Sequence, residues 1–235
     1  IETELMLADL QTLERRRDKL EKKVRAGEAG SAQEMAFLSG LIERLGKGEW
    51  LGSGATSSAE QAWLREYQLL TAKPMVFAVN VGEGQEETPA VRRVAELARA
   101  RGARAVTIAG SIEAEVSALA SDDRADYLRE LGIGEGGLVR LVRTAYDLLG
   151  LITFFTAGET ESRAWTIREG TKAAQAAGKI HSDMERGFIR AEVYHYNDLI
   201  TCGNEAGVKE KGLFRLEGRD YLIKDGDVMF FRFNV

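Results

Sequence analysis

The chain has 235 residues, of which 44% are hydrophobic and 29% charged, a composition that excludes a disordered or collagen-like protein. Its 32 Lys and Arg against 37 Asp and Glu give a net charge of −5, which excludes bulk attraction to nucleic acid or to an anionic membrane as its main property. The single cysteine, Cys202, excludes an intramolecular disulfide, and no apolar run approaches the roughly 20 residues of a membrane span, so we expect a cytoplasmic protein.

Residues 1–72 are predicted to form an antiparallel helical hairpin followed by a further helix near 59–70. Ser31 and Glu34 have the spacing of a capping box at the start of the second helix. A Gly-Ser stretch, residues 52–58, separates the hairpin from the further helix. Apolar residues recur every three or four positions on both sides of a break at residues 27–30, namely Leu10, Leu13, Leu20 and Val24 before it and Met35, Leu38, Ile42 and Leu45 after it.

The first of these helices carries a run of basic residues, among them Arg15, Arg16, Lys19 and Lys22. Two interpretations stay open. The run is either a solvated helix surface or an arm that contacts the phosphates of a nucleic acid.

Residues 73–150 have the pattern of a parallel α/β unit. The continuous apolar run 75–79 is typical of a strand buried on both faces, and residues 105–108 resemble a second such strand. Between them, Thr88 and Pro89 are a good N-cap and first residue for a helix that ends near Gly102. This succession predicts a right-handed βαβ unit, followed by helices over 122–131 and 138–149.

Residues 151–235 predict a compact mixed-sheet domain. Strands are expected at 151–156, 164–167, 189–194 and 228–233, where β-branched and aromatic residues gather between turn residues. Asp225, Gly226 and Asp227 predict a turn between the run 221–223 and the last strand. One short helix is expected, near 197–200 or 205–211.

Several patterns that could signal a catalytic or metal site do not hold. Gly132, Gly134 and Gly137 have the spacing of a dinucleotide fingerprint but follow a helix instead of a strand, and no G-x-x-x-x-G-K-[ST] exists in the chain. The two histidines, His181 and His195, have no cysteine nearby for a structural zinc site, and Cys202 has no evident base. We therefore assign no catalytic residue and no metal ligand.

The end of the first predicted strand is the better candidate for a binding site. Ligands of open α/β sheets bind beyond the carboxyl ends of the strands, where Asn80 and Glu83 lie. The Asn80 amide can both donate to and accept from a nucleobase. The second strand ends in a small-residue turn with Gly110 and Ser111, which would let backbone N–H groups approach a planar ligand. The alternative is that Asn80 and Glu83 only shape a βα turn.

These residues carry a resemblance to a known family. The run Asn80-Val81-Gly82-Glu83 resembles the N-x-x-E base-recognition motif of the YchF/Obg-like ATPases, and residues 111–115 are similar to the family's following motif. Ala174 stands where the family usually has Pro. The most specific matches are to the family's C-terminal TGS domain, at residues 154–158, 163–167, 175–181, 187–189, 225–227 and 233–235.

The resemblance implies three domains of α/β, α and α+β class. These are a coiled-coil hairpin (1–72) inserted in a P-loop G domain, the C-terminal half of that G domain (73–150), and a ubiquitin-like β-grasp TGS domain (151–235). It implies an ATP or GTP hydrolase that uses Mg²⁺ and associates with the ribosome or ribosomal RNA. Neither sequence-specific DNA binding nor membrane binding is expected. The phosphate loop, the Mg²⁺ ligands and the catalytic residue are then expected upstream of Ile1, where the chain begins inside a helix without an initiator Met.

The implied base-binding residues are Asn80, Val81, Glu83, Gly110 and Ser111, and Arg15, Arg16, Lys19 and Lys22 are the candidate ribosome contacts. Guanine-specific G domains use N-K-x-D, whereas Val81 and Glu83 stand at the Lys and Asp positions here. We therefore expect a preference for ATP over GTP. The alternative function is a non-enzymatic RNA-binding or protein-binding module built from the helical arm and the C-terminal domain.

Overall fold

The structure is a computed structural model that describes residues 1–52, 57–158 and 161–234. It divides into two compact units, Ile1–Gly137 and Leu138–Val235, and each is described by itself. Most of the Gly-Ser stretch predicted as a separator (53–56) and the last residue of the C-terminal motif, Val235, lie outside the described residues. Over the described residues the fold is of mixed α/β class, with one parallel and one mixed sheet. The division into three domains stays a prediction.

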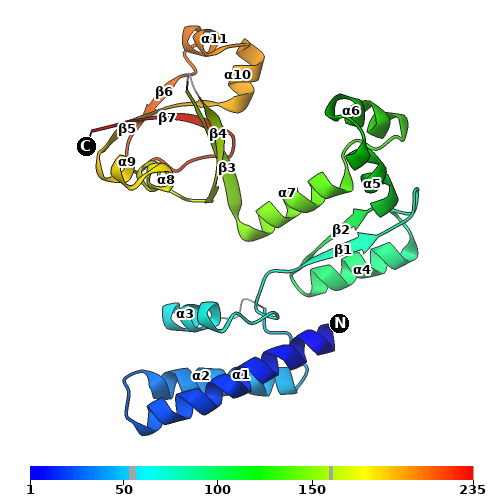
Figure 1. Cartoon of the computed structure of the whole chain (residues 1–235), viewed down its shortest axis with the longest axis vertical. Coiled ribbons are helices and arrows are strands. Elements are labelled where there is room, and N and C mark those ends of the chain that lie inside the picture. The colour runs from blue at the N-terminus through cyan, green and yellow to red at the C-terminus, as the bar shows by residue number, and fades with distance from the viewer. Residues whose placement is uncertain (53–56, 159–160, 235) are drawn as a thin grey trace. The chain divides into compact units, whose positions relative to one another are not determined.

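The first unit begins with the expected helical hairpin (Figure 1). Helices α1 (Glu2–Arg25) and α2 (Ser31–Gly46) are joined by a turn in which Gly27 and Gly30 have positive φ angles of 73° and 80°. Helix α3 (Ser58–Tyr67) follows. The predicted seam is confirmed, because its members are buried in one cluster or packed against it: Leu13, Leu20, Leu38 and Leu45 are buried, and Leu10, Val24, Met35 and Ile42 pack against them.

The predicted capping box at Ser31 is wrong. Ser31 is already the first helical residue, and its hydroxyl donates to the Glu28 carbonyl at 2.6 Å. Its expected partner Glu34 accepts a hydrogen bond from the Tyr67 hydroxyl on α3 at 3.0 Å. A capping box occurs instead at α3, where Ser57 and Glu60 satisfy each other's backbone N–H groups at 3.0 and 3.2 Å.

A buried carboxylate fastens the segment after α3 to the hairpin. Asp9 on α1 is 2% exposed and accepts from the backbone N–H groups of Leu70 and Thr71 at 2.8 and 2.7 Å. Its second oxygen also accepts from the Thr71 hydroxyl at 2.7 Å. Since all three donors are paired, this carboxylate can be buried without orphaned polar groups.

The parallel α/β part completes the first unit. Strands β1 (Val76–Asn80) and β2 (Arg104–Ile108) pair in parallel, with Asn80 opposite Ile108. Helix α4 (Pro89–Ala100) connects them and packs against both strands, and the Thr88 hydroxyl caps it as predicted by accepting from the Val91 N–H. Helices α5 (Gly110–Ala118) and α6 (Ser121–Glu130) follow.

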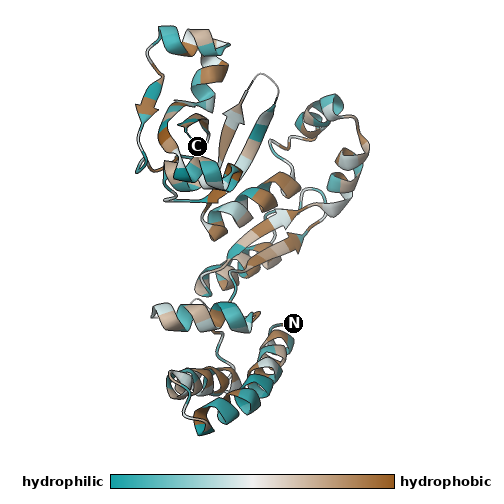
Figure 2. Ribbon diagram, turned by 60° about the vertical axis from the view of Figure 1, so that its left-hand side comes forward, coloured by the Kyte–Doolittle hydropathy of each residue, from teal (hydrophilic) through white to brown (hydrophobic). Residues whose placement is uncertain are grey.

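The strand β1 is not buried on both faces, contrary to the sequence pattern. Val76, Phe77 and Val79 are only half-buried, and Ala78 is exposed. The physical reason is that the sheet of this unit has two strands and α4 covers only part of it. The largely hydrophobic strands are visible in Figure 2.

The second unit is a five-stranded sheet with helices around it, in the strand order β4-β3-β7-β5-β6. The four expected strands are confirmed, and their neighbours are antiparallel except for the β3–β7 pair. The elements are α7 (Gly137–Leu149), β3 (Leu151–Ala157), β4 (Ser162–Arg168), α8 (Ala173–Ile180), α9 (Ser182–Arg186), β5 (Phe188–His195), α10 (Tyr196–Cys202), α11 (Glu205–Glu210), β6 (Arg215–Glu217) and β7 (Asp227–Phe233).

The prediction of one short helix in this region is wrong, since the described residues 161–234 contain four, and both proposed segments are helical. The sequence pattern did not predict helix α8, because the buried face of this helix is made of alanines. Ala173, Ala176 and Ala177 are fully buried in one cluster with Phe154 and Met229. A run of alanines has no large apolar side chains to distinguish the buried positions of a helix from the exposed ones. The predicted turn is confirmed, with Gly226 at a φ of 82°, but residues 221–223 form no strand.

A second buried carboxylate organises the turn before β7. Asp227 is fully buried and accepts from the Tyr221 hydroxyl at 2.8 Å and from the Lys224 N–H at 2.9 Å. The Arg215 guanidinium donates to its other oxygen at 3.3 Å. Burial and the Asp227 carboxylate raise the pKa of Tyr221 to about 12, because the ionised phenol would be poorly solvated beside a negative charge.

Neither a helix suited to crossing a membrane nor a group of metal-binding side chains occurs among the described residues. None of the helices placed there is both long and apolar enough to cross a membrane. Within the same residues, no three His, Cys, Asp or Glu side chains are grouped so that they could hold a metal ion.

Candidate functional site

Asn80 lies at the carboxyl end of β1, directly opposite the end of β2. The parallel pairing continues one residue further, because the Val81 N–H donates to the Ile108 carbonyl at 2.9 Å. The two chain segments that leave the strands therefore start side by side. This is the place in an open α/β sheet where ligands bind.

Asn80 and Gly110, both expected among the base-binding residues, are in contact. The Gly110 N–H donates to Asn80 Oδ1 at 3.1 Å. A Cβ atom on residue 110 would lie 3.1 Å from the same oxygen, so the close approach of the backbone favours glycine. The contact fixes the Asn80 amide with its Nδ2 free of hydrogen-bond partners among the described residues, as a donor for a ligand.

Gly110 and Ser111 do not form the expected open turn. They are the first residues of helix α5, which has no side-chain cap at Ala109. Asn80 takes the place of that cap by accepting from the first N–H of the helix. Ser111 is exposed in the first turn, where backbone N–H groups have no partner within the helix. The physical reason for the difference is that residues 111–118 continue the helical hydrogen bonding.

Val81 and Glu83 lie on the loop that leaves β1. Val81 is half-buried, and Glu83 is exposed at the second position of a turn closed by the Gln85 N–H on the Gly82 carbonyl at 3.1 Å. Gly84 has a φ of 70° in this turn, which a residue with a side chain rarely adopts. Glu83 is thus held by the turn's backbone and not by a side-chain contact to Asn80.

Glu83 also lies within electrostatic reach of helix α6. The Tyr127 hydroxyl donates to the Glu115 carboxylate, and this hydrogen bond together with the negative charges of Glu115 and Glu83 raises the pKa of Tyr127. The electrostatic potential around Glu83 is therefore negative. This potential disfavours binding of a negatively charged ligand group at this edge of the site.

Glu113, which lies within the motif at residues 111–115, also belongs to the site. Its carboxylate on α5 accepts a hydrogen bond from the Gly137 N–H. A Cβ atom on residue 137 would lie 3.2 Å from the Ile108 Cα and 3.3 Å from the Thr107 carbonyl oxygen. Gly137 is thus pressed against the end of β2. The signal that could have found this contact is a glycine that starts a helix without a capping side chain before it.

The candidate ribosome contacts on α1 separate into two kinds. Arg15, Lys19 and Lys22 are exposed and have no ion pair in the described part of the chain. They lie at intervals of four and three, hence on one helix face. Arg15 and Lys19, with Lys23, line a groove of about 450 Å³ along α1.

Arg16, unlike its three basic neighbours, is held in contacts with side chains of α2 and α3. Its guanidinium lies 4.6 Å from the centre of the Tyr67 ring and pairs with the carboxylates of Glu34 and Glu66. Burial and the hydrogen bond to Glu34 raise the pKa of Tyr67. Arg16 therefore connects α1 with α2 and α3, and it is not as available for a partner as its three basic neighbours.

The arrangement around Asn80 can recognise a planar ligand but offers little for bond cleavage. The residues placed there supply an amide donor, an apolar side chain and the N–H groups of a helix start. His181, His195 and Cys202 belong to the other compact unit.

Comparisons with known proteins agree with the sequence resemblance. Residues 151–234 match the family model YchF-GTPase_C, described as a protein of unknown function (DUF933). The whole chain is 44% identical over 236 residues to the ribosome-binding ATPase YchF of Escherichia coli O157:H7, and 41% identical over 239 residues to that of Bacillus subtilis. In both cases the chain spans 65% of the relative's length.

A solved structure has the same fold. The YchF GTPase of Schizosaccharomyces pombe superposes with a TM-score of 0.79 at 27% sequence identity. The match covers 99% of this chain and 64% of that one.

Proposed function

This chain belongs to the YchF family, and on that premise we propose that it carries the purine-binding part of the nucleotide site in a P-loop NTPase that binds the ribosome. The observation that carries the proposal is the contact of Asn80 with Gly110 at the carboxyl ends of two parallel strands. The contact leaves an amide donor directed by a fixed backbone, and such a donor suits N7, the acceptor common to adenine and guanine.

The phosphates and Mg²⁺ are proposed to be held by a part of the protein outside this chain. The sequence has no G-x-x-x-x-G-K-[ST], and the chain spans 65% of the length of its relatives. Phosphoryl transfer depends on positioned phosphates and metal. The residues of this chain would then orient the base, and they would not hydrolyse ATP or GTP by themselves.

The residues next to Asn80 favour ATP over GTP. Guanine presents two N–H donors, at N1 and N2, to an aspartate in N-K-x-D sites. Glu83 has one more methylene than aspartate and sits in a turn whose surroundings are already negative. Val81 provides an apolar contact without the charge of a lysine. Adenine has no N1–H, so the absence of the aspartate costs it nothing.

The test is a calorimetric titration of the full-length protein with ATP and with GTP. The Val81→Lys, Glu83→Asp variant restores the guanine pattern and should shift the preference toward GTP by about ten- to a hundredfold, since a charge-assisted hydrogen bond is worth roughly 1.5–3 kcal/mol. Val91→Ala, on helix α4, is a control outside the loop. Wild-type protein that binds GTP tenfold more tightly than ATP would contradict the proposal.

Contact with the ribosome is proposed for the exposed basic face of α1, formed by Arg15, Lys19 and Lys22. It is supported by their exposure and by the groove that two of them line. Phosphate groups of ribosomal RNA are the ligands such a face attracts. Residues 151–235 are proposed to form a TGS domain because residues 151–234 match the family's C-terminal model.

A further inference from the structure

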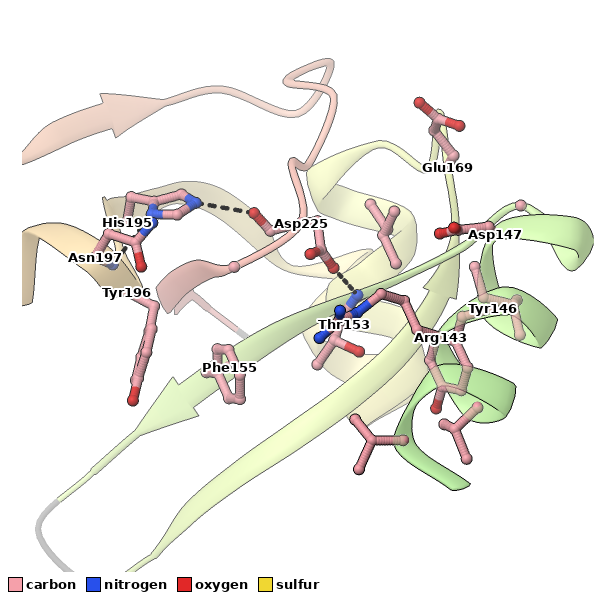
Figure 3. Close-up of a pocket in the computed structure, with 16 residues that line it drawn as sticks. Arg143, Tyr146, Asp147, Thr153, Phe155, Glu169, His195, Tyr196, Asn197 and Asp225 are labelled. Atoms are coloured by element: carbon pink, nitrogen blue, oxygen red, sulfur yellow. Dashed lines mark hydrogen bonds between the residues drawn. The ribbon is translucent and has the colours of Figure 1, made fainter. Parts of the chain in front are cut away.

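A groove of about 880 Å³ lies within the second unit, and none of the residues proposed above to contact the nucleotide or the ribosome lines it. We call it the α7 groove. One wall is formed by Val139, Val142 and Tyr146 of helix α7, and the opposite wall includes Phe155 of β3 and Tyr196 at the start of α10 (Figure 3). Val139 and Val142 are each about half exposed, so α7 presents two uncovered apolar side chains to the groove.

The floor of the groove is held by a closed set of hydrogen bonds. The Asp225 carboxylate accepts from the Thr153 N–H at 2.8 Å, and the Gly226 N–H returns to the Thr153 carbonyl at 2.8 Å. His195 Nδ1 accepts from the Asn197 N–H at 3.1 Å, and its Nε2 lies 3.0 Å from the Asp225 carbonyl. A floor tied in this way is preorganised, which lowers the entropy cost of binding.

Gly226 is required by this arrangement. It has a φ of 82°, and a Cβ atom there would lie 2.8 Å from His195 Nε2. Helix α7, which forms one wall, is connected to strand β4 by a hydrogen bond of 3.0 Å between the hydroxyls of Tyr146 and Thr166.

The groove offers an aromatic surface next to negative charge. The rings of Phe155 and Tyr196 are 5.7 Å apart and tilted by 35°, and Tyr196 is 45% exposed. Three carboxylates line the groove, those of Asp147, Glu169 and Asp225, against the single guanidinium of Arg143. The carboxylates of Asp147 and Glu169 make no hydrogen bond or ion pair in the described part of the chain.

We propose that the α7 groove binds an extended basic segment of a partner protein. An arginine or lysine side chain of that segment would lie against the Tyr196 ring, where the face of an aromatic ring attracts a cation. Its neighbours would meet the carboxylates of Asp147 and Glu169, and its apolar residues the exposed valines of α7. The excess of carboxylates selects against a nucleic acid, whose phosphates it repels. The proposal goes beyond nucleotide and ribosome binding and depends on neither.

The experiment uses the 235-residue chain and a fluorescein-labelled peptide of alternating arginine and leucine, followed by fluorescence anisotropy. Asp147→Lys combined with Glu169→Lys should weaken binding about tenfold, because two exposed attractive pairs become repulsive. Tyr196→Ala should weaken it about threefold through loss of the cation–π contact. The matched control, Glu161→Lys with Glu210→Lys, makes the same change of charge at exposed positions of the unit outside the groove and should leave the affinity within about twofold.

A peptide in which glutamine replaces arginine and a short oligouridine complete the design. Neither should bind the wild-type chain measurably, and circular dichroism should show the same folded spectrum for every variant. The proposal is overturned if the arginine peptide shows no saturation up to about 1 mM, or binds the groove variants as well as the control. Oligouridine binding that the groove variants change would instead identify the groove as a nucleic-acid site. Because no nucleotide is added, these outcomes leave the proposed function untouched.

Discussion

Asp9 shows how one side chain can hold a long segment of backbone. It lies 61 positions before Leu70 and 62 before Thr71, and it binds both backbone N–H groups. The segment it fastens leads from α3 into β1 and so to Asn80. The position of the first strand therefore depends on a carboxylate that lies far away in the sequence.

Replacing Asp9 by Asn should lower the free energy of unfolding by about 2–4 kcal/mol, because the amide nitrogen cannot accept and leaves a buried N–H group unpaired. A urea titration followed by tryptophan fluorescence measures this. Asp18→Asn, an exposed carboxylate on the same helix, is the matched control and should change stability by less than about 0.5 kcal/mol. Equal effects of the two substitutions would contradict the anchoring role of Asp9.

Because of Tyr221, the second unit is expected to lose stability as the pH rises into the alkaline range. Its pKa is raised to about 12 by burial and by Asp227, and an unfolded tyrosine has a pKa near 10. The neutral phenol is thus favoured in the folded state. Its contribution to stability is complete below about pH 10 and is lost as the pH rises through 12.

Tyr221→Phe should cost about 1–2 kcal/mol at neutral pH, because Asp227 loses a hydrogen-bond donor. The variant should also lack the part of the stability loss between about pH 10 and 12 that Tyr221 causes in the wild type. Thermal unfolding at several pH values, followed by circular dichroism, measures both effects. Tyr196→Phe, at a residue that is 45% exposed, serves as the control. Parallel pH curves for wild type and Tyr221→Phe would refute the linkage.

At the scale of elements, helix α1 has two faces with different tasks. Arg16 holds the helices of the hairpin together, whereas Arg15, Lys19 and Lys22 point to solvent. Reversing Arg16 would place a third carboxylate beside Glu34 and Glu66 and damage the fold. A test of the exposed face must therefore leave Arg16 in place.

Changing Arg15, Lys19 and Lys22 together to Glu should weaken ribosome binding of the full-length protein about tenfold or more and reduce its salt dependence, since fewer counterions are released. Co-sedimentation at several salt concentrations measures this. The matched control reverses Arg92, Arg93 and Arg99, three exposed arginines of α4. If both triple variants bind like the wild type, this face is not the contact.

At the scale of the whole molecule, each compact unit has a core of its own. The core of the second unit includes Phe154, Met229 and Phe231, which all lie within residues 138–235. Among the residues that the structure describes, none of the first unit belongs to this cluster. A fragment of residues 138–235 has all the apolar partners that its core uses.

We expect this fragment to fold alone and to unfold in one cooperative thermal transition, with an enthalpy of about 60–70 kcal/mol as is usual for a domain of this size. Calorimetry and the fluorescence of Trp165, the fragment's single tryptophan, follow it. Phe154→Ala in the same fragment should abolish or greatly lower the transition. A fragment without a cooperative transition would show that its core needs the first unit.

The sequence alone determined the features that neighbouring residues encode. Thr88 and Pro89 mark a helix start by their own chemistry, and the glycines at 27 and 30 permit the turn of the hairpin. The spacing of the seam residues repeats with the helical period, so their burial followed from the pattern. The sequence also places Asn80 and Gly110 at the ends of two parallel strands, which lie at one edge of a sheet, and the structure shows them in contact.

Only the tertiary structure decided the features that join distant residues. Glu34 lies 33 residues from Tyr67 and Arg16 lies 50 from Glu66, and these contacts replaced a predicted capping box and an expected free charge. The burial of β1 depended on how many strands and helices surround it, which its own residues do not encode. The α7 groove likewise consists of residues spread over α7, β3, β5 and the turn at Asp225. Local sequence sets backbone preferences, whereas burial, pairing and cavities arise only when separate segments pack together.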